Sequence, residues 1–127
     1  MDEQEFAIVR GLVPVAWADG EFAETEKQMI EALLDAYNAS PSQKKEILDY
    51  AKEKRTLEDI HLQDLSATDR RVLLQHAVLL SFADGQQSPH ESTFLNSLIE
   101  RLRIPKEEAD SVVTVSAERA KKSLNLL

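Results

Sequence analysis

Two short acidic segments have the residue types and the spacing to bind a cation. Asp19-Gly20 is followed by Glu26, and Asp84-Gly85 is followed by Glu91, so each aspartate precedes its glutamate by the same interval. Carboxylate oxygens are the ligands that hard divalent ions prefer, and backbone carbonyls and water complete such a shell. We therefore expect Ca²⁺, Mg²⁺ or Mn²⁺ to bind at Asp19 with Glu26, or at Asp84 with Glu91.

The same residues can also be explained as signals that end one helix and begin the next. A glycine ends a helix in a left-handed conformation, an aspartate hydrogen-bonds the turn, and Glu91 can close a capping box with Ser88. Ala23 stands at the position that corresponds to Ser88. An alanine side chain accepts no hydrogen bond, so it cannot complete a capping box with Glu26. The first segment is therefore the better candidate for binding, and the second is the better candidate for turn formation.

An EF-hand is excluded despite the similar spacing of its aspartate, glycine and glutamate. The first and third positions of an EF-hand loop need oxygen ligands. Here those positions would be Val15 or Leu80 and Trp17 or Phe82, which have no carboxylate.

Helices must position these segments, because nothing in the sequence indicates strands. The chain has only three glycines and four prolines, and no window alternates between apolar and polar residues as a half-buried strand does. Helical spacing of apolar residues and capping residues at Ser40 and Ser66 predict an all-α fold in one domain of residues 1–127. The expected helices, about seven, cover residues 3–18, 24–37, 41–54, 57–65, 67–83, 89–102 and 106–122.

The two Asp-Gly segments indicate an internal duplication. We call the separation between Asp19 and Asp84 the repeat offset. At this offset the identical pairs are Ala18 and Ala83, Asp19 and Asp84, Gly20 and Gly85, Glu26 and Glu91, and Leu33 and Leu98. Apolar positions around them match as well, which predicts that residues of about 6–38 and 67–103 form the same helix–loop–helix unit.

An apolar helix that ends in Ala-Asp-Gly, followed by a short loop, a glutamate and a second apolar helix, resembles the tellurite-resistance TerB-like domains. It is similar also to the N-terminal portion of membrane-anchored DnaJ-like co-chaperones, and the resemblance covers residues of about 6–120. It implies a seven-helix fold with internal duplication, a stress-response role, and metal binding at Asp19, Glu26, Asp84 and Glu91. The chain has no His-Pro-Asp tripeptide, so J-domain activity is not implied.

The charge of the chain is unevenly distributed. The net charge is −8, and residues 1–64 carry 15 acidic and 7 basic side chains while the remainder carries 8 of each. Scattered basic pairs argue against a nucleic-acid partner, and an acidic half suits a cation or a basic protein surface. There is no cysteine, the first residues are acidic, and no apolar run is long enough to span a bilayer, so we expect a cytoplasmic protein without membrane insertion.

Catalysis finds no support in the sequence. His61, His76 and His90 form no metal-binding pattern, and there is no phosphate-binding loop or nucleophile elbow. We expect His76 to be a core or groove histidine and Trp17 a core anchor. Two hypotheses follow: a cation-binding module of the TerB-like kind, and a protein-interaction adapter with an acidic docking face and no metal.

Overall fold

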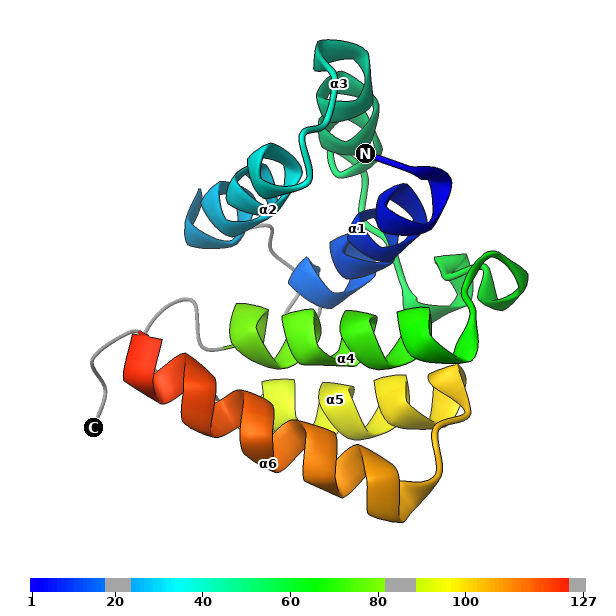
Figure 1. The fold of residues 1–127 in the computed structure, drawn as a ribbon, viewed down its shortest axis with the longest axis vertical. Coiled ribbons are helices and arrows are strands. Elements are labelled where there is room, and N and C mark those ends of the chain that lie inside the picture. The colour runs from blue at the N-terminus through cyan, green and yellow to red at the C-terminus, as the bar shows by residue number, and fades with distance from the viewer. Residues whose placement is uncertain (18–23, 82–88, 124–127) are drawn as a thin grey trace.

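The computed structural model describes residues 1–17, 24–81 and 89–123, which contain helices and no strand (Figure 1). Six α-helices and two short 3-10 helices occur in this part of the chain. The elements are α1 (Glu3–Ala16), α2 (Glu24–Ala36), α3 (Pro41–Tyr50), η1 (Leu57–Asp59), η2 (Leu62–Asp64), α4 (Ala67–Ser81), α5 (Pro89–Leu102) and α6 (Lys106–Ser123). None of the described helices is long and apolar enough to cross a membrane.

Local capping explains where two of the helices begin. The Oγ of Ser40 accepts a hydrogen bond from the amide of Gln43 at 3.2 Å, and the Oγ of Ser66 accepts one from the amide of Asp69 at 3.0 Å. The side chains of Gln43 and Asp69 reciprocate by accepting hydrogen bonds from the amides of the two serines. These boxes satisfy amides that have no partner inside the helix, and they confirm the starts predicted at Ser40 and Ser66.

The predicted helix over residues 57–65 is wrong. Two separate 3-10 turns occupy this segment, and each ends in a residue with extended backbone, Ile60 and Leu65. Arginines from α4 and α5 bind the carbonyls here: Arg101 donates to Ile60 O at 3.0 Å, and Arg70 donates to Leu62 O at 2.9 Å and to Leu65 O at 3.2 Å. The bond to Ile60 O satisfies a carbonyl that a continuous helix over residues 57–65 would have paired internally, and the bonds to Leu62 O and Leu65 O satisfy carbonyls that such a helix would have left without an internal partner.

Helix α4 lies at the centre of the molecule and packs against α1, α5 and α6. Figure 1 shows α4 across the middle, with α1, α2 and α3 on one side of it and α5 and α6 on the other. The side chains of Leu73, Leu74, Ala77 and Val78 on α4 are fully buried. The apolar side chains of this helix therefore fill the core from several sides.

The described helix boundaries recur at the repeat offset. It relates the starts of α2 and α3 to the starts of α5 and α6, and the end of α1 to the end of α4. It also relates Asn38 to Arg103, the residues that follow α2 and α5, which have φ values of 58° and 57°. The next amides, of Ala39 and Ile104, each donate to the carbonyl five residues back, at 2.9 and 3.4 Å, which is the bond of a Schellman motif.

Candidate functional site

The predicted acidic site lies only partly within the described residues. Asp19 and Asp84 lie outside them. Glu26 is half-buried in the first turn of α2, and Glu91 belongs to the first turn of α5. Residues 1–17, 24–81 and 89–123 on their own contain no group of three or more His, Asp or Glu side chains that could hold a metal ion.

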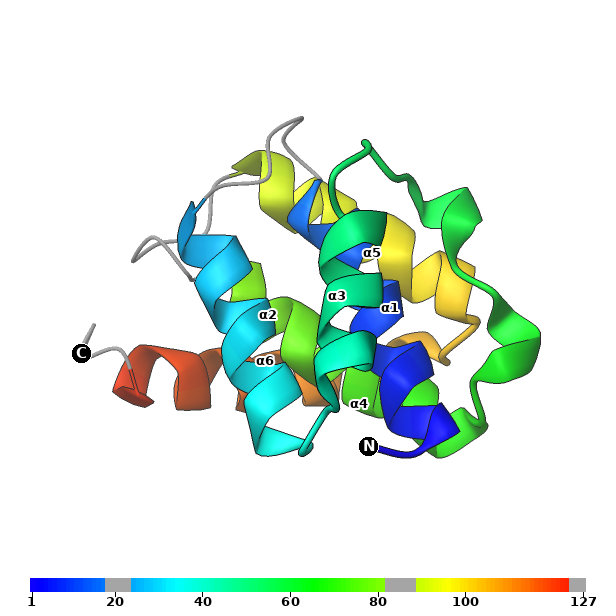
Figure 2. The ribbon, with the colours of Figure 1, turned by 90° about the horizontal axis from the view of Figure 1, so that it is seen from above.

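The helix ends that flank the two acidic segments lie on one side of the molecule. Figure 2 shows the last turns of α1 and α4 and the first turns of α2 and α5 on the same side. Acidic side chains stand in the first turn of α2, at Glu24 and Glu26, where the positive end of the helix dipole favours them. The fold therefore brings the neighbourhoods of both predicted loops to a common end.

Trp17 anchors the end of α1 at this side of the molecule. It is half-buried against the core, and its indole Nε1 donates to the carbonyl of Ala51 at 3.0 Å. The prediction of a core anchor is confirmed. Together with Leu57 and Phe94 it also borders a hollow of about 390 Å³, whose rim carries Lys54 and Arg55.

The described histidines do not come together. His61 is exposed, and its Nδ1 lies 3.6 Å from a carboxylate oxygen of Asp64. His76 is half-buried on α4, and its Nε2 lies 2.9 Å from the hydroxyl of Tyr37, at the end of α2. The two rings meet edge to face, with centroids 6.2 Å apart. His76 is therefore a structural histidine that joins α4 to the end of α2, in agreement with the prediction from its apolar helix.

Burial shifts the pKa values of His76 and Tyr37 in opposite directions. Desolvation lowers the pKa of His76 below its ordinary value of 6.5, because the charged imidazolium is disfavoured away from water. Desolvation also raises the pKa of Tyr37, and the nearby carboxylates of Glu5 and Asp2 raise it further. The pair is accordingly neutral at pH 7, with a phenol hydroxyl and an uncharged imidazole sharing one hydrogen bond.

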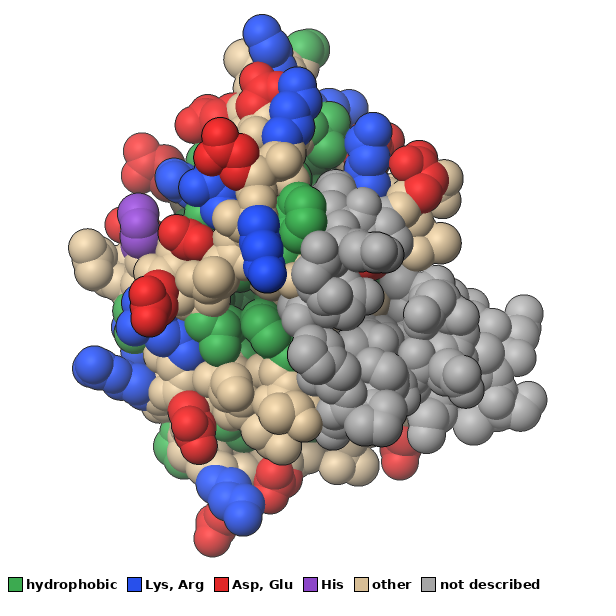
Figure 3. Space-filling view, turned by 180° about the vertical axis from the view of Figure 1, so that it is seen from behind, with side chains coloured by type: hydrophobic (Ala, Val, Ile, Leu, Met, Phe, Trp, Pro, Cys, Tyr) green, Lys and Arg blue, Asp and Glu red, His purple; other side chains and the backbone are tan. Residues whose placement is uncertain are grey.

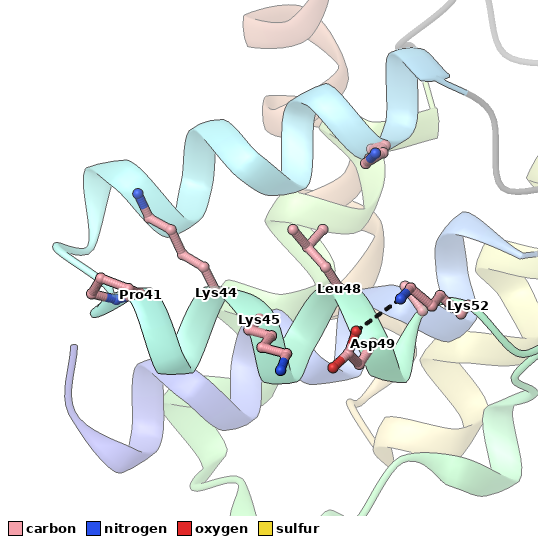
Figure 4. A pocket seen from close by; sticks show the side chains of 8 residues that line it. Pro41, Lys44, Lys45, Leu48, Asp49 and Lys52 are labelled. Carbon is pink, nitrogen blue, oxygen red and sulfur yellow. Dashed lines mark ion pairs between the residues drawn. The ribbon is translucent and has the colours of Figure 1, made fainter.

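An open groove separates α2 from α3 (Figure 4). Its volume is about 620 Å³, and Figure 4 shows the side chain of Leu48 extending from α3 toward α2. Most of the lining surface is apolar, although four lysines contribute to it. The lining residues are Lys27, Pro41, Lys44, Lys45, Leu48, Asp49, Ala51 and Lys52.

Elsewhere the charged side chains are mixed. On the face shown in Figure 3, the described acidic and basic residues are interspersed, and neither sign gathers in one extended patch. This distribution does not form the continuous basic stripe with which proteins follow a phosphate backbone.

Sequence reasoning missed the groove and the partner of His76. Lys44, Lys45, Leu48 and Lys52 recur at helical spacing, so the sequence contained a signal that these residues share one face of a helix. No comparable signal links Tyr37 to His76, because 39 residues separate them and only the packing of α2 on the core brings them together.

Comparisons with protein-family models, with curated proteins and with solved structures find no match to this chain. The resemblance to TerB-like domains accordingly rests on the repeated Ala-Asp-Gly segments and the residues around them.

Proposed function

We propose that this chain is a non-enzymatic cytoplasmic binding module of the TerB-like kind, built from two copies of a three-helix unit, and that it acts in a tellurite-type stress response. The units are α1–α3 and α4–α6. What supports the duplication is the repeat offset, which relates their helix boundaries and the left-handed residues Asn38 and Arg103. The contacts agree with it, because α1 packs on α2 and α3 as α4 packs on α5 and α6, and α1 packs on α4.

Divalent-cation binding at the acidic loops is the function that this arrangement supports best. The observation that carries it is the position of the helix ends that flank both loops, which lie on one side of the molecule (Figure 2). Glu26 and Glu91 occupy the same position in the first turns of α2 and α5. With Asp19 and Asp84 they supply carboxylate oxygens, the ligand type that Ca²⁺, Mg²⁺ and Mn²⁺ take.

Thermal unfolding with added ions tests this proposal. An ion that binds only the folded chain stabilises it by about 2.7 kcal/mol at a concentration of about 100 times its Kd. We expect Ca²⁺, Mg²⁺ or Mn²⁺ to raise the Tm, and Asp19→Asn to remove that rise while Asp84→Asn retains most of it. Asp110→Asn, an exposed aspartate on α6, is the matched control and keeps the full response.

Two results would contradict the cation proposal. One is that no ion raises the Tm at millimolar concentration. The other is that the double variant Asp19→Asn with Asp84→Asn responds to the ion as the unmodified chain does.

An adapter that docks a basic protein surface is the second candidate. A hollow of about 450 Å³ between α3 and the start of α1 is bordered by the acidic residues Asp2, Glu3 and Glu46 and by the apolar side chain of Phe6. This surface binds a basic peptide in a manner that weakens with salt and survives chelation. Glu46→Lys is expected to weaken the binding, and binding that a chelator abolishes would argue against the adapter.

A further inference from the structure

The lysines of this acidic chain are concentrated in the groove between α2 and α3. Residues 1–64 contain only seven basic side chains among 15 acidic ones, and four of the seven line this one groove. They are Lys27 on α2, Lys44 and Lys45 on α3, and Lys52 just after α3. The lining therefore carries four positive charges and one negative charge, that of Asp49, on the half of the chain that carries the whole negative excess.

The groove follows the axis of α3. Its lining residues on α3 stand at positions 41, 44, 45, 48 and 49, so it runs parallel to the helix axis for about 12 Å, or just over two helical turns. Lys27 on α2 belongs to the opposite wall. A solvent-open groove between two helices accepts a third helix, which lays its apolar side chains between the walls.

The side chains supply both an apolar floor and a charged rim. Pro41, Leu48, Ala51 and the methylene stems of the lysines form the apolar surface, while lysine ammonium groups extend into water. Figure 4 shows Lys44 and Lys45 as separate arms on α3, with Leu48 between α3 and α2. Apolar side chains of a ligand can therefore contact the floor while its carboxylates reach the rim.

The ammonium groups remain available to a ligand. Lys27 pairs with Glu31 at 4.0 Å, Lys52 pairs with Asp49 at 3.1 Å, and Lys44 pairs with Asp35. All these side chains are between 42% and 75% exposed, and exposed pairs of this kind contribute little stability. Within the described part of the chain, Lys45 has no ion pair.

We propose that the groove between α2 and α3 docks an acidic amphipathic helix of a partner protein, with leucine-type side chains over Leu48 and glutamates or aspartates facing Lys44, Lys45 and Lys52. The charge complementarity between the lysine rim and an acidic ligand selects this occupant. The site is separate from the acidic loops and binds without a metal ion.

A designed peptide tests the proposal directly. The probe is a fluorescein-labelled helix of about 18 residues made of leucine, glutamate and alanine, with leucine at every third or fourth position. The first control has the same composition in scrambled order, and the second has lysine in place of every glutamate. Fluorescence anisotropy with the full chain, in the presence of a chelator, is expected to show saturable binding of the first peptide and at least tenfold weaker binding of both controls.

Paired charge reversals locate the binding site. Lys44→Glu with Lys45→Glu is expected to weaken binding roughly tenfold, because two attractions are replaced by two repulsions. The control Lys54→Glu with Lys106→Glu makes the same change in net charge at exposed lysines outside the groove, and is expected to change Kd less than twofold. Circular dichroism establishes that both variants keep their helix content, and Leu48→Gln provides a variant of the apolar floor at unchanged net charge.

Several results would overturn the proposal. They are equal binding of the ordered and scrambled peptides, equal loss of binding in the groove and control variants, and binding that vanishes with the chelator. Displacement of the peptide by dodecanoate at a lower concentration than by unlabelled peptide would assign the groove to an acyl chain instead. Loss of the cation response described above leaves the peptide result unaffected, because the two experiments use different residues.

Discussion

The repeat offset relates the start of α3 to the start of α6, but the two helices differ in how they pack. Helix α6 has 18 residues and packs along α4, to which the bidentate pair of Arg71 and Glu108 also ties it. Helix α3 has 10 residues, of which only Ile47 is buried. Its outer face lines the groove between α2 and α3, so α6 packs against the core where α3 leaves an open groove that we propose as a docking site.

One pair of residues explains much of this difference. The repeat offset relates Lys44 on α3 to Ala109 on α6, and the alanine is fully buried while the lysine side chain is 42% exposed. A lysine is almost never fully buried without a partner, because its charge loses hydration. Helix α3 therefore cannot close onto its neighbours at this position as α6 does.

Substitutions at Ala109 and Lys44 are expected to give the largest difference in the free energy of unfolding. Ala109→Lys places a charge at a buried position and should lower the free energy of unfolding by roughly 3–5 kcal/mol, the cost of an uncompensated buried charge. The reverse change, Lys44→Ala, should alter it by less than about 0.5 kcal/mol, because its ion pair is exposed. Urea unfolding of the two variants measures the contrast, and similar costs at both sites would refute it.

The hydrogen bond between Tyr37 and His76, which joins the end of α2 to α4, is expected to contribute less to the free energy of unfolding. Tyr37→Phe removes the hydroxyl that lies 2.9 Å from His76 Nε2, and should cost about 0.5–1.5 kcal/mol in the free energy of unfolding. Tyr50→Phe is a matched control, because the Tyr50 ring lies beneath the guanidinium groups of Arg10 and Arg55 and phenylalanine keeps that ring. A smaller loss for Tyr37→Phe than for the control would contradict the role of this bond.

The burial of His76 gives the free energy of unfolding a pH dependence. Since the pKa of His76 is lowered in the folded chain, the unfolded chain binds a proton that the folded chain does not. The stabilisation is therefore complete above pH 6.5, the ordinary pKa of the unfolded histidine, and is lost as the pH falls through the lowered pKa. Unfolding measured between about pH 7.5 and 5 should show less pH dependence for His76→Gln, and an unchanged profile in that variant would be inconsistent with the shift.

The two residues with left-handed backbone conformation, Asn38 and Arg103, are expected to show the smallest difference in the free energy of unfolding. Arg103→Gly removes a side chain from a residue with φ 57°, and should raise the free energy of unfolding by about 0.5–1 kcal/mol. Asn38→Gly, at φ 58°, should raise it by less, because asparagine tolerates this conformation better than arginine. Thermal unfolding of both variants compares them, and a larger gain at Asn38 would reverse the expected order.

The sequence predicted the features that short segments determine. The caps at Ser40 and Ser66 and the start of α5 at Pro89 follow from neighbouring residues, and the central position of α4 follows from its apolar character. The segment 57–65 could not be predicted, because Arg70 and Arg101 bind its carbonyls from other helices. The groove could not be predicted, because it depends on the position of α2 beside α3. Only the helical spacing of its lysines was visible in the sequence. Asp19 and Asp84 lie outside the described residues, so their cation site stays a prediction.

Amide chemical shifts during titration with the acidic helical peptide test the difference between α3 and α6 most directly. The predicted result is that resonances of Lys44, Lys45 and Leu48 move and saturate together, while those of their counterparts at the repeat offset, Ala109, Asp110 and Val113, stay in place. Equal movement at both sets of positions, or movement confined to the second set, would contradict a binding site in the groove between α2 and α3.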